Sequence, residues 1–420
     1  MIKYKEGEKV RLVIIGNSAA GLSAAKTIRK YDQKSEITII SKEEGLAYSR
    51  VLLPYVLREK VDYNNIFIKD KAYYEENAIT YIEDEVVALD TLEKLITVNK
   101  GQAIRYDKLL IATGSHAVTP PIEGLNGSGI YHMWTKNDLD DLLPLFNQKK
   151  SVAIIGSGFV SLQAAWAAKC RGLEVSIIEI ADRVMPNVLD KKGSEVMANH
   201  IVDSGLSLYT SMITEKVERQ EDSSFKLHLK NRQPLVVDFV IVGAGVKSNI
   251  SFIQNSNIVY DRAILVNEKM ETNIKDVYAA GDVAAGPTVF GDKHMTHALW
   301  PTAVEMGEIA GANMIGKQRR YQGSLNMNVT QMYGVTVASM GIFDDEQIDG
   351  SYEFPMDQYK GYIKLCYKNS LIVGACIIGE SESVKLLGKL RPIIKKGLRI
   401  DCDPEKIESY IDIQAFQNRY

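Results

Sequence analysis

The sequence is poor in cysteine and has no cysteine pair. Its 420 residues contain four cysteines, and no two of them form a CxxC motif: Cys170, Cys366, Cys376 and Cys402. This pattern excludes a disulfide framework and a thiolate zinc site, and it favours a reducing compartment. The first nine residues are polar and charged and lack an apolar secretory segment. We therefore expect a cytoplasmic protein.

Long apolar runs and an excess of positive charge are also missing. The longest apolar stretches end after about ten residues, as at residues 371–379, which is too short to span a bilayer. The chain has 50 Lys and Arg against 53 Asp and Glu, so it lacks the basic excess that binding to a nucleic-acid backbone needs. Apolar residues make up 45% and charged residues 25%, which is ordinary for a folded protein of two to four domains.

One strand–turn–helix–strand pattern occurs twice in the first half of the chain. An apolar run at residues 11–15 ends at Gly16, and a helical segment and a second apolar run at 36–41 follow. The pattern returns with an apolar run at 151–155, Gly156, a helical segment and an apolar run at 174–179. Apolar strands of this kind are typical of parallel sheets covered on both faces. The repeat predicts an α/β protein with two Rossmann-like dinucleotide-binding domains.

Each glycine turn suits a pyrophosphate. The first glycine permits the sharp turn, the next small residue lets the backbone approach the phosphates, and the helix N-terminus offers N–H groups and a positive dipole end. Neither turn is a perfect GxGxxG, because Ser18 replaces the middle glycine of the first and Ser161 the last glycine of the second. We expect both to bind, with looser helix packing at Ser161; the alternative is two such layers without a ligand. The candidate residues of the two turns are Gly16, Ser18, Ala19, Ala20 and Gly21, and Gly156, Gly158, Phe159 and Val160.

The second strand of each unit should end near an acid that accepts hydrogen bonds from the adenosine ribose. Glu179 is in this position in the second unit and favours NADH over NADPH, whose phosphate a carboxylate repels. Arg183 could partly offset that repulsion. The first unit has Ser41 there, followed by Lys42 and Glu43. Glu43 is the candidate for the ribose, with Ser41 or a solvated loop charge as alternatives.

Three further motifs follow strands. Residues 106–115 predict a strand that ends in Ala112, Thr113 and Gly114, and residues 239–245 predict one that ends at Gly245. A third strand closes on the sequence AAGD, which ends in Gly281 and Asp282. Asp282 could cap a helix and accept a hydrogen bond from a ribityl hydroxyl.

In this order and spacing, the two glycine turns, ATG and AAGD resemble the pyridine nucleotide-disulfide oxidoreductase family of flavoproteins. The resemblance implies FAD at the first turn and at AAGD, and NAD at the second turn. It implies a discontinuous FAD domain at 1–117 and 246–318 and an inserted NAD domain at 118–245. It also implies a C-terminal α/β domain at 319–420, typically a dimer interface, so we expect a homodimer.

Residues 47–55 decide the branch of the family. Other branches carry a redox cysteine here, but this stretch contains Tyr48, Ser49 and Arg50 and no sulfur. It resembles the branch of NADH:rubredoxin, ferredoxin and nitrite-reductase-linked reductases, in which the flavin is the only redox centre. The resemblance implies transfer of a hydride from NADH to flavin N5, and then of electrons to a rubredoxin- or ferredoxin-like carrier or a small acceptor. The alternatives are an NADH oxidase or peroxidase, and a non-enzymatic FAD/NADH redox sensor.

The resemblance also suggests residues beside the flavin. Phe159 resembles an aromatic gate over the flavin, with plain packing as the alternative, and Gln163 stands where relatives have a Glu that contacts the carboxamide. Arg50 is the candidate polar partner of the flavin, with a surface salt bridge as the alternative. Residues 299–303 resemble a helix start that points at the flavin, where the dipole would stabilise the reduced ring. Thr302 would offer a backbone N–H there, and Trp300 is either a redox neighbour or a core residue.

The remaining patterns carry less chemistry. His294 and His297 have no accompanying ligand cluster, so no metal site is expected. Strands are predicted at about 334–340, 359–368 and 371–378 and a helix at 381–396, the second strand with one solvated face. The helix is basic and could dock an acidic carrier; the alternative is a solvated helix face.

Overall fold

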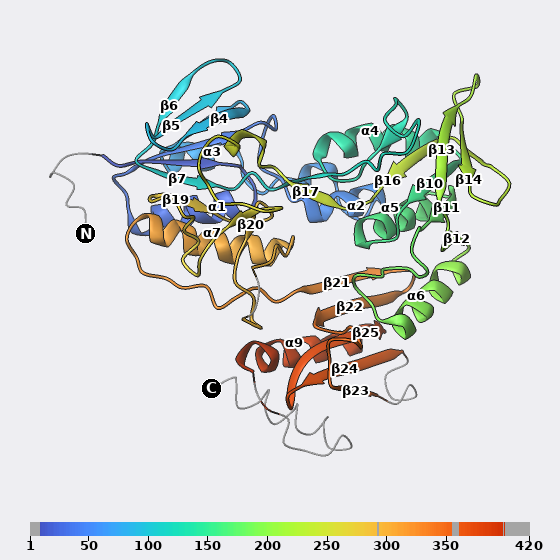
Figure 1. Cartoon of the computed structure of the whole chain (residues 1–420). Helices are drawn as coiled ribbons and strands as arrows, with labels where there is room; N and C mark the ends of the chain where they lie inside the picture. Colours follow the sequence, from blue (N-terminus) through green and yellow to red (C-terminus); the bar gives the residue numbers. More distant parts are fainter. Residues whose placement is uncertain (1–8, 292–293, 355–360, 398, 400–420) are drawn as a thin grey trace. The chain divides into compact units, whose positions relative to one another are not determined.

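The computed structural model describes residues 9–291, 294–354, 361–397 and 399 (Figure 1). The chain divides into two compact units. The first consists of Met1–Val51, Asp62–His116 and Val246–Leu325, and the second of Leu52–Val61, Ala117–Gly245 and Asn326–Tyr420. The described ranges contain no helix that is long and apolar enough to cross a membrane.

The first unit is built on a parallel five-stranded sheet with the order β19-β7-β1-β2-β3. Its strands are β1 (Arg11–Ile15), β2 (Glu36–Ser41), β3 (Ile79–Glu83), β7 (Lys108–Ile111) and β19 (Val277–Ala279). A three-stranded antiparallel sheet accompanies it, made of β4 (Val86–Asp90), β5 (Leu95–Val98) and β6 (Ala103–Arg105). Its shorter elements, of which η1 and β8 end one residue beyond the unit, are η1 (Arg50–Leu52), η2 (Tyr63–Ile66), α3 (Lys71–Glu76), β8 (Ser115–Ala117), β17 (Val246–Ser248), η3 (Ser251–Ile253), β18 (Ile264–Leu265) and β20 (Ala284–Ala285).

Two helices of this unit, α1 (Ala19–Tyr31) and α7 (Trp300–Met314), lie close together because glycines face alanines. A Cβ atom on Gly307 would come 2.2 Å from the carbonyl oxygen of Ala20, and one on Gly311 would come 2.6 Å from that of Ala24. This contact holds the start of α1 against α7.

The second unit repeats the plan. Its parallel sheet has the order β12-β11-β10-β16-β9, and its antiparallel sheet has the order β13-β14-β15. The predicted pair of Rossmann-like units is confirmed. The elements are α2 (Leu53–Leu57), β9 (Ile130–Tyr131), α4 (Lys136–Gln148), β10 (Ser151–Ile155), α5 (Phe159–Cys170), β11 (Glu174–Ile178), α6 (Lys191–Asp203), β12 (Ser207–Tyr209), β13 (Thr214–Arg219), β14 (Phe225–Leu229), β15 (Leu235–Val237) and β16 (Phe239–Val242).

The second unit also contains an antiparallel sheet with the order β21-β22-β25-β24-β23, and α9 (Ser381–Lys396) packs on β22 and β25. The strands are β21 (Met327–Met332), β22 (Val335–Gly341), β23 (Gly350–Glu353), β24 (Tyr362–Lys368) and β25 (Leu371–Gly379). The predicted strands at 334–340 and 371–378 and the helix at 381–396 are present. Of the strand predicted at 359–368, residues 359 and 360 lie outside the described residues.

The prediction that β24 has one solvated face is wrong. Five consecutive residues of β24, from Tyr362 to Cys366, are buried, and Lys364 is 3% exposed. Both α9 and α6 pack against the neighbouring β25, and Asp190 at the start of α6 pairs with Lys364. The polar side of the strand therefore faces protein rather than water.

Candidate functional site

The first glycine turn lies between β1 and α1, and its glycines are required by close backbone contacts. Gly16 has φ +122°, and a Cβ atom on it would lie 2.0 Å from the carbonyl oxygen of Ala112. A Cβ atom on Gly21 would lie 2.0 Å from the carbonyl oxygen of Gly16, and one on Gly281 would lie 3.2 Å from the Cβ of Ala20. The structure thus brings together the first turn, ATG and AAGD, as a single cofactor site requires.

The second turn, between β10 and α5, has the same form. Gly156 has φ +101°, and a Cβ atom on it would come 2.5 Å from the carbonyl oxygen of Gly243. Ser161 is 1% exposed, and its Oγ donates a hydrogen bond of 3.1 Å to that carbonyl. A Cβ atom on Gly243 would lie 2.0 Å from the Ser161 Oγ. The looser packing expected at Ser161 is therefore wrong, because a glycine on the facing segment makes room for the serine.

The three helices that begin at the candidate motifs lack side-chain caps, as does the short α2. Ser18, Gly158 and Leu299 precede α1, α5 and α7, and none of them makes a side-chain cap or is followed by an acid in the first turn. In contrast, α3, α4 and α6 are capped by the side chains of Asp70, Thr135 and Asp190. An uncapped N-terminus offers backbone N–H groups and a positive dipole end to an anion. The two glycine turns therefore fit the pyrophosphates of FAD and NAD.

Asp282 lies in the first unit just after β19. Its Oδ2 accepts a hydrogen bond of 2.9 Å from the Ser115 hydroxyl, and burial raises its pKa above the ordinary value. The predicted helix cap is wrong, because the AAGD turn leads into β20 and α7 begins only at Trp300. A half-buried carboxyl group beside the first turn is nevertheless a suitable partner for a hydroxyl of FAD, which stays a prediction.

The loop around ATG is fixed by Asn249, which the sequence did not indicate. The side-chain amide of Asn249 donates to the Thr113 carbonyl at 2.8 Å, and the Thr113 hydroxyl donates to the Asn249 carbonyl at 2.8 Å. Gly114 and Gly245 have φ +66° and +103°, and no atom lies within 4 Å of a Cβ built on either. Their role is a backbone conformation that suits glycine rather than a tight contact.

Glu43 lies just beyond β2, and its carboxylate accepts hydrogen bonds from two neighbouring side chains. The Tyr48 hydroxyl donates to its Oε2 at 2.5 Å, and the Arg50 guanidinium pairs with its Oε1. The charge of Arg50 also reaches Asp282, where it opposes the rise in pKa. Arg50 thus makes a salt bridge, as its alternative interpretation stated, but the salt bridge lies among the candidate FAD residues. Ser41 accepts from the Glu43 N–H at 3.3 Å.

Lys42 differs from its neighbours in this group. Its Nζ lies 3.7 Å from the Oε1 of Glu85, and the side chains of both residues are more than half exposed. It therefore makes a solvent-exposed ion pair on the surface, and nothing in its contacts points to a cofactor.

Glu179 is held tightly at the end of β11 in the second unit. It is 7% exposed, its Oε2 accepts from the Ser157 hydroxyl at 2.6 Å, and its Oε1 accepts from the Ala181 N–H at 2.8 Å. Arg183 pairs with Asp182 at 3.0 Å. Ser157 was missed by the sequence analysis: it lies inside the glycine turn, but only the fold shows that it contacts Glu179.

Residues on α5 give the second unit its remaining candidates. Gln163 donates from Nε2 to the Thr330 hydroxyl at 2.6 Å, and its buried Oε1 has no partner among the described residues. The contact of Gln163 with the nicotinamide carboxamide stays a prediction. Phe159, the first residue of α5, is half-buried, and Val160 is 37% exposed. Neither the gate nor the packing interpretation of Phe159 is tested by these positions.

The start of α7 has the predicted form. The helix begins at Trp300, with Pro301 in its first turn, and Thr302 is 7% exposed. Trp300 is half-buried and packs against the core of the first unit, which does not distinguish its core and redox interpretations. The half-buried His297 precedes the helix, its Nδ1 has no partner within the described ranges, and burial lowers its pKa.

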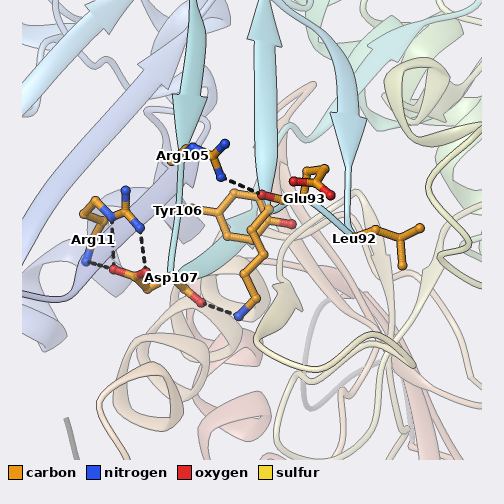
Figure 2. Close-up of a pocket in the computed structure, with 7 residues that line it drawn as sticks. Arg11, Leu92, Glu93, Arg105, Tyr106 and Asp107 are labelled. Carbon is orange, nitrogen blue, oxygen red and sulfur yellow. Dashed lines mark hydrogen bonds and ion pairs between the residues drawn. The ribbon is translucent and has the colours of Figure 1, made fainter.

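A separate pocket lies in the first unit, away from the glycine turn. It has a volume of about 220 Å³. Arg11 binds Asp107 there through two side-chain hydrogen bonds of 3.1 and 2.8 Å (Figure 2). Arg11 begins β1, whereas the glycine turn follows the other end of that strand. Dinucleotides bind at the carboxyl ends of parallel strands, so this pocket is not their site. It is lined by Arg11, Leu92, Glu93, Lys94, Arg105, Tyr106 and Asp107.

The described cysteines are not arranged for redox chemistry. Cys366 and Cys376 are fully buried, and burial raises the pKa of both thiols, that of Cys366 to about 12. Cys170 is exposed at the end of α5, and Cys402 lies outside the described residues. No cysteine occurs in the segments of the first unit. In the described ranges, no cluster of three or more His, Cys, Asp and Glu could hold a metal ion.

Comparison with known proteins gives a consistent result. The family model "Pyridine nucleotide-disulphide oxidoreductase" matches residues 10–307. An NADH oxidase of Methanocaldococcus jannaschii is 32% identical over 344 residues, which cover 79% of this chain and 76% of that protein. An NADH-rubredoxin oxidoreductase of Clostridium acetobutylicum is 31% identical over 396 residues, which cover 94% and 97%.

A solved structure supports the same assignment. The NAD-dependent persulfide reductase from A. fulgidus matches with a TM-score of 0.87 and 27% identity, and the match covers 93% of this chain and 78% of that one. The fold, the paired glycine turns and these relatives agree: the chain belongs to the pyridine nucleotide-disulphide oxidoreductase family and is an oxidoreductase that uses FAD and NADH.

Proposed function

We propose that this protein is an FAD-dependent NADH:acceptor oxidoreductase whose acceptor is a separate molecule, either a small carrier of the rubredoxin or ferredoxin class or a small compound. The relative in Clostridium acetobutylicum is named for rubredoxin and matches nearly the full length of both chains. The first unit contains no cysteine. A thiol relay therefore has no cysteine within the unit that would hold FAD, and an external acceptor is the simplest outlet for the electrons.

In this proposal, residues of the first unit bind FAD and residues of the second unit bind NADH. The first turn, Asp282 and Arg50 would hold FAD, and the second turn, Glu179 and Gln163 would hold NADH. When bound, FAD supplies the ability to accept an electron pair from NADH and to release it to the acceptor. The start of α7 would place a positive dipole end beside negative charge in the FAD site, which stabilises that charge. The domain ranges expected from the sequence, with FAD at 1–117 and 246–318 and NAD at 118–245, form part of this proposal.

One observation carries the nucleotide preference. Glu179 is 7% exposed and accepts hydrogen bonds from Ser157 and from the Ala181 N–H, so its carboxylate is fixed and poorly solvated. A fixed carboxylate can accept from ribose hydroxyls but repels the 2′-phosphate of NADPH. We therefore propose that NADH is preferred over NADPH.

The test is anaerobic reduction of the FAD-loaded protein. We expect NADH to bleach the flavin absorbance at least about tenfold faster than NADPH at equal concentration, which corresponds to about 1.4 kcal/mol. Addition of oxidised rubredoxin, ferredoxin or a dye should restore the colour and identify the acceptor class. A colourless preparation that does not take up FAD would refute the proposal, and equal rates with the two nucleotides would refute the preference.

An oxidase is the second candidate, because the relative in Methanocaldococcus jannaschii is named NADH oxidase. Without a cysteine in the unit that would hold FAD, oxygen would react only at the flavin, and we expect a low rate. Rapid water-forming turnover at an oxygen electrode would favour the oxidase. A long-lived reduced complex and an NADH-dependent change of mass in sedimentation would favour the redox sensor instead. The homodimer and the cytoplasmic location stay predictions.

A further inference from the structure

We propose that Ser157 is a positioning residue that sets the nucleotide selectivity of the second unit by fixing the carboxylate of Glu179. This inference rests on the proposed NADH preference and adds a residue to it. Ser157 lies between the two glycines of the second turn, so its hydroxyl starts from the backbone that would hold the pyrophosphate. It connects that backbone to the group that would hold the ribose.

The Ser157 hydroxyl both donates and accepts a hydrogen bond. Its Oγ donates to the Oε2 of Glu179 at 2.6 Å and accepts from the Met185 N–H at 3.2 Å. The hydroxyl has one proton, and the Met185 N–H can only donate, so the proton of Ser157 lies toward Glu179. Ser157 is 1% exposed, which leaves little room for other orientations of the hydroxyl.

The carboxylate keeps the acceptor capacity that a ribose needs. One oxygen of Glu179 accepts from Ser157 and the other from the Ala181 N–H. Each ionised carboxylate oxygen has two lone-pair sites, so each retains one for a ribose hydroxyl. The two protein donors thus orient Glu179 without saturating it.

The same hydroxyl fixes the loop after β11. Met185 has φ +51°, an unfavourable conformation for a residue other than glycine, and its N–H bonds to both the hydroxyl and the carbonyl oxygen of Ser157. In that loop Arg183 pairs with Asp182 and donates to the Pro186 carbonyl at 3.5 Å. Arg183, the cation that could offset the repulsion of a 2′-phosphate, is thus engaged within its own loop. Loss of the Ser157 hydroxyl should free both Glu179 and this loop.

The experiment compares NAD⁺ and NADP⁺ binding to the FAD-loaded protein by calorimetry, with Ser157→Ala as the variant. We expect about a tenfold loss of NAD⁺ affinity, because the lost hydrogen bond is made to a carboxylate and such bonds are stronger than neutral ones. The affinity for NADP⁺ should change less than about threefold. In steady-state assays the KM for NADH should rise while kcat stays within about twofold. A NAD⁺/NADP⁺ affinity ratio within about twofold of wild type would overturn the inference.

Ser194→Ala is the matched control. Ser194 is also 1% exposed, and its hydroxyl donates to the Val184 carbonyl at 2.7 Å in the same loop, without a contact to Glu179. It should lose stability but keep the wild-type affinity ratio. If this control lowered the ratio as much as Ser157→Ala, loosening of the loop rather than the hydroxyl would set selectivity, and the inference would fail.

Two further measurements keep the test decisive. Ser157→Gly removes the same hydroxyl and suits a turn of glycines, so it replaces Ser157→Ala if that variant does not fold. In a Glu179→Gln background the loss of the Ser157 hydroxyl should have little additional effect on the ratio, whereas full additivity would contradict the inference. A wild type that shows no preference for NAD⁺ refutes the proposed NADH preference on which this inference rests. A wild type with the preference and an unchanged Ser157→Ala ratio refutes only the role of Ser157.

Discussion

Lys364 illustrates at the scale of one residue what the sequence could not reveal. Its side chain is 4% exposed, and its Nζ lies 2.9 Å from Asp190 and 2.6 Å from Asp345. Burial opposes its charge, but the hydrogen bonds to the two carboxylates outweigh that effect and raise its pKa. Asp190 also accepts from the Tyr362 hydroxyl at 2.6 Å and caps α6. Alternation along a strand cannot indicate such partners, because they come from distant segments.

We predict that Lys364→Met lowers the free energy of unfolding by about 3–5 kcal/mol, because it leaves Asp190 buried with an unpaired charge. Denaturant unfolding followed by circular dichroism measures the change. Lys192→Met is the control: Lys192 pairs with Glu353, but both side chains are about half exposed, so it should cost less than about 1 kcal/mol. Equal losses in the two variants would contradict the buried-pair account.

At the scale of elements, the glycine turns could be predicted and their surroundings could not. Gly16 and Gly156 were identified because a strand, a turn and a helix leave a local pattern in the sequence. The role of Asp282 as a helix cap was predicted incorrectly, because the length of chain between β19 and α7 depends on tertiary contacts. Asn249 and Ser157 act through partners that are distant in sequence or set by the fold.

His297, which lies just before α7, leads to a prediction about how the stability of the protein depends on pH. Burial lowers the pKa of His297 below its ordinary value of 6.5, so the native state holds it neutral where the unfolded chain binds a proton. Stability therefore falls as the pH falls below about 6.5. When the pH is lowered from about 7 to about 5, the free energy of unfolding should fall less for His297→Gln than for wild type. Urea midpoints across that range measure the difference.

The control for this pH effect is His294→Gln, because His294 is exposed near the same helix. It should keep the pH dependence of wild type. If the urea midpoint fell equally steeply with decreasing pH in wild type and in His297→Gln, the imidazole of His297 would not be held neutral in the native state.

At the scale of the whole molecule, the sequence predicted the two repeated units and the sheet that follows them, because each has its own periodic pattern. The sequence did not predict that residues 52–61 belong to the second unit, since that assignment depends on packing. Under the assignment proposed above, FAD stabilises the glycine turn of the first unit and NAD⁺ stabilises the glycine turn of the second.

Hydrogen exchange of the apo-protein should therefore separate the two nucleotides. We expect FAD to protect the amides at the start of α1 and around Asp282, and NAD⁺ to protect those at the start of α5, because a ligand slows exchange in the segment that it binds. The start of α4, which Thr135 caps, should be unchanged by either. Protection of α1 by NAD⁺ alone would contradict the assignment of the turns.

The close fit of Ser161 to Gly243 has an evolutionary consequence. The serine occupies the space that a glycine usually leaves at the third position of the turn, and Gly243 supplies that space from the facing segment. A change at either position alone therefore creates a clash or a void. In descendants of this sequence, the two positions are free to drift only as a compensating pair.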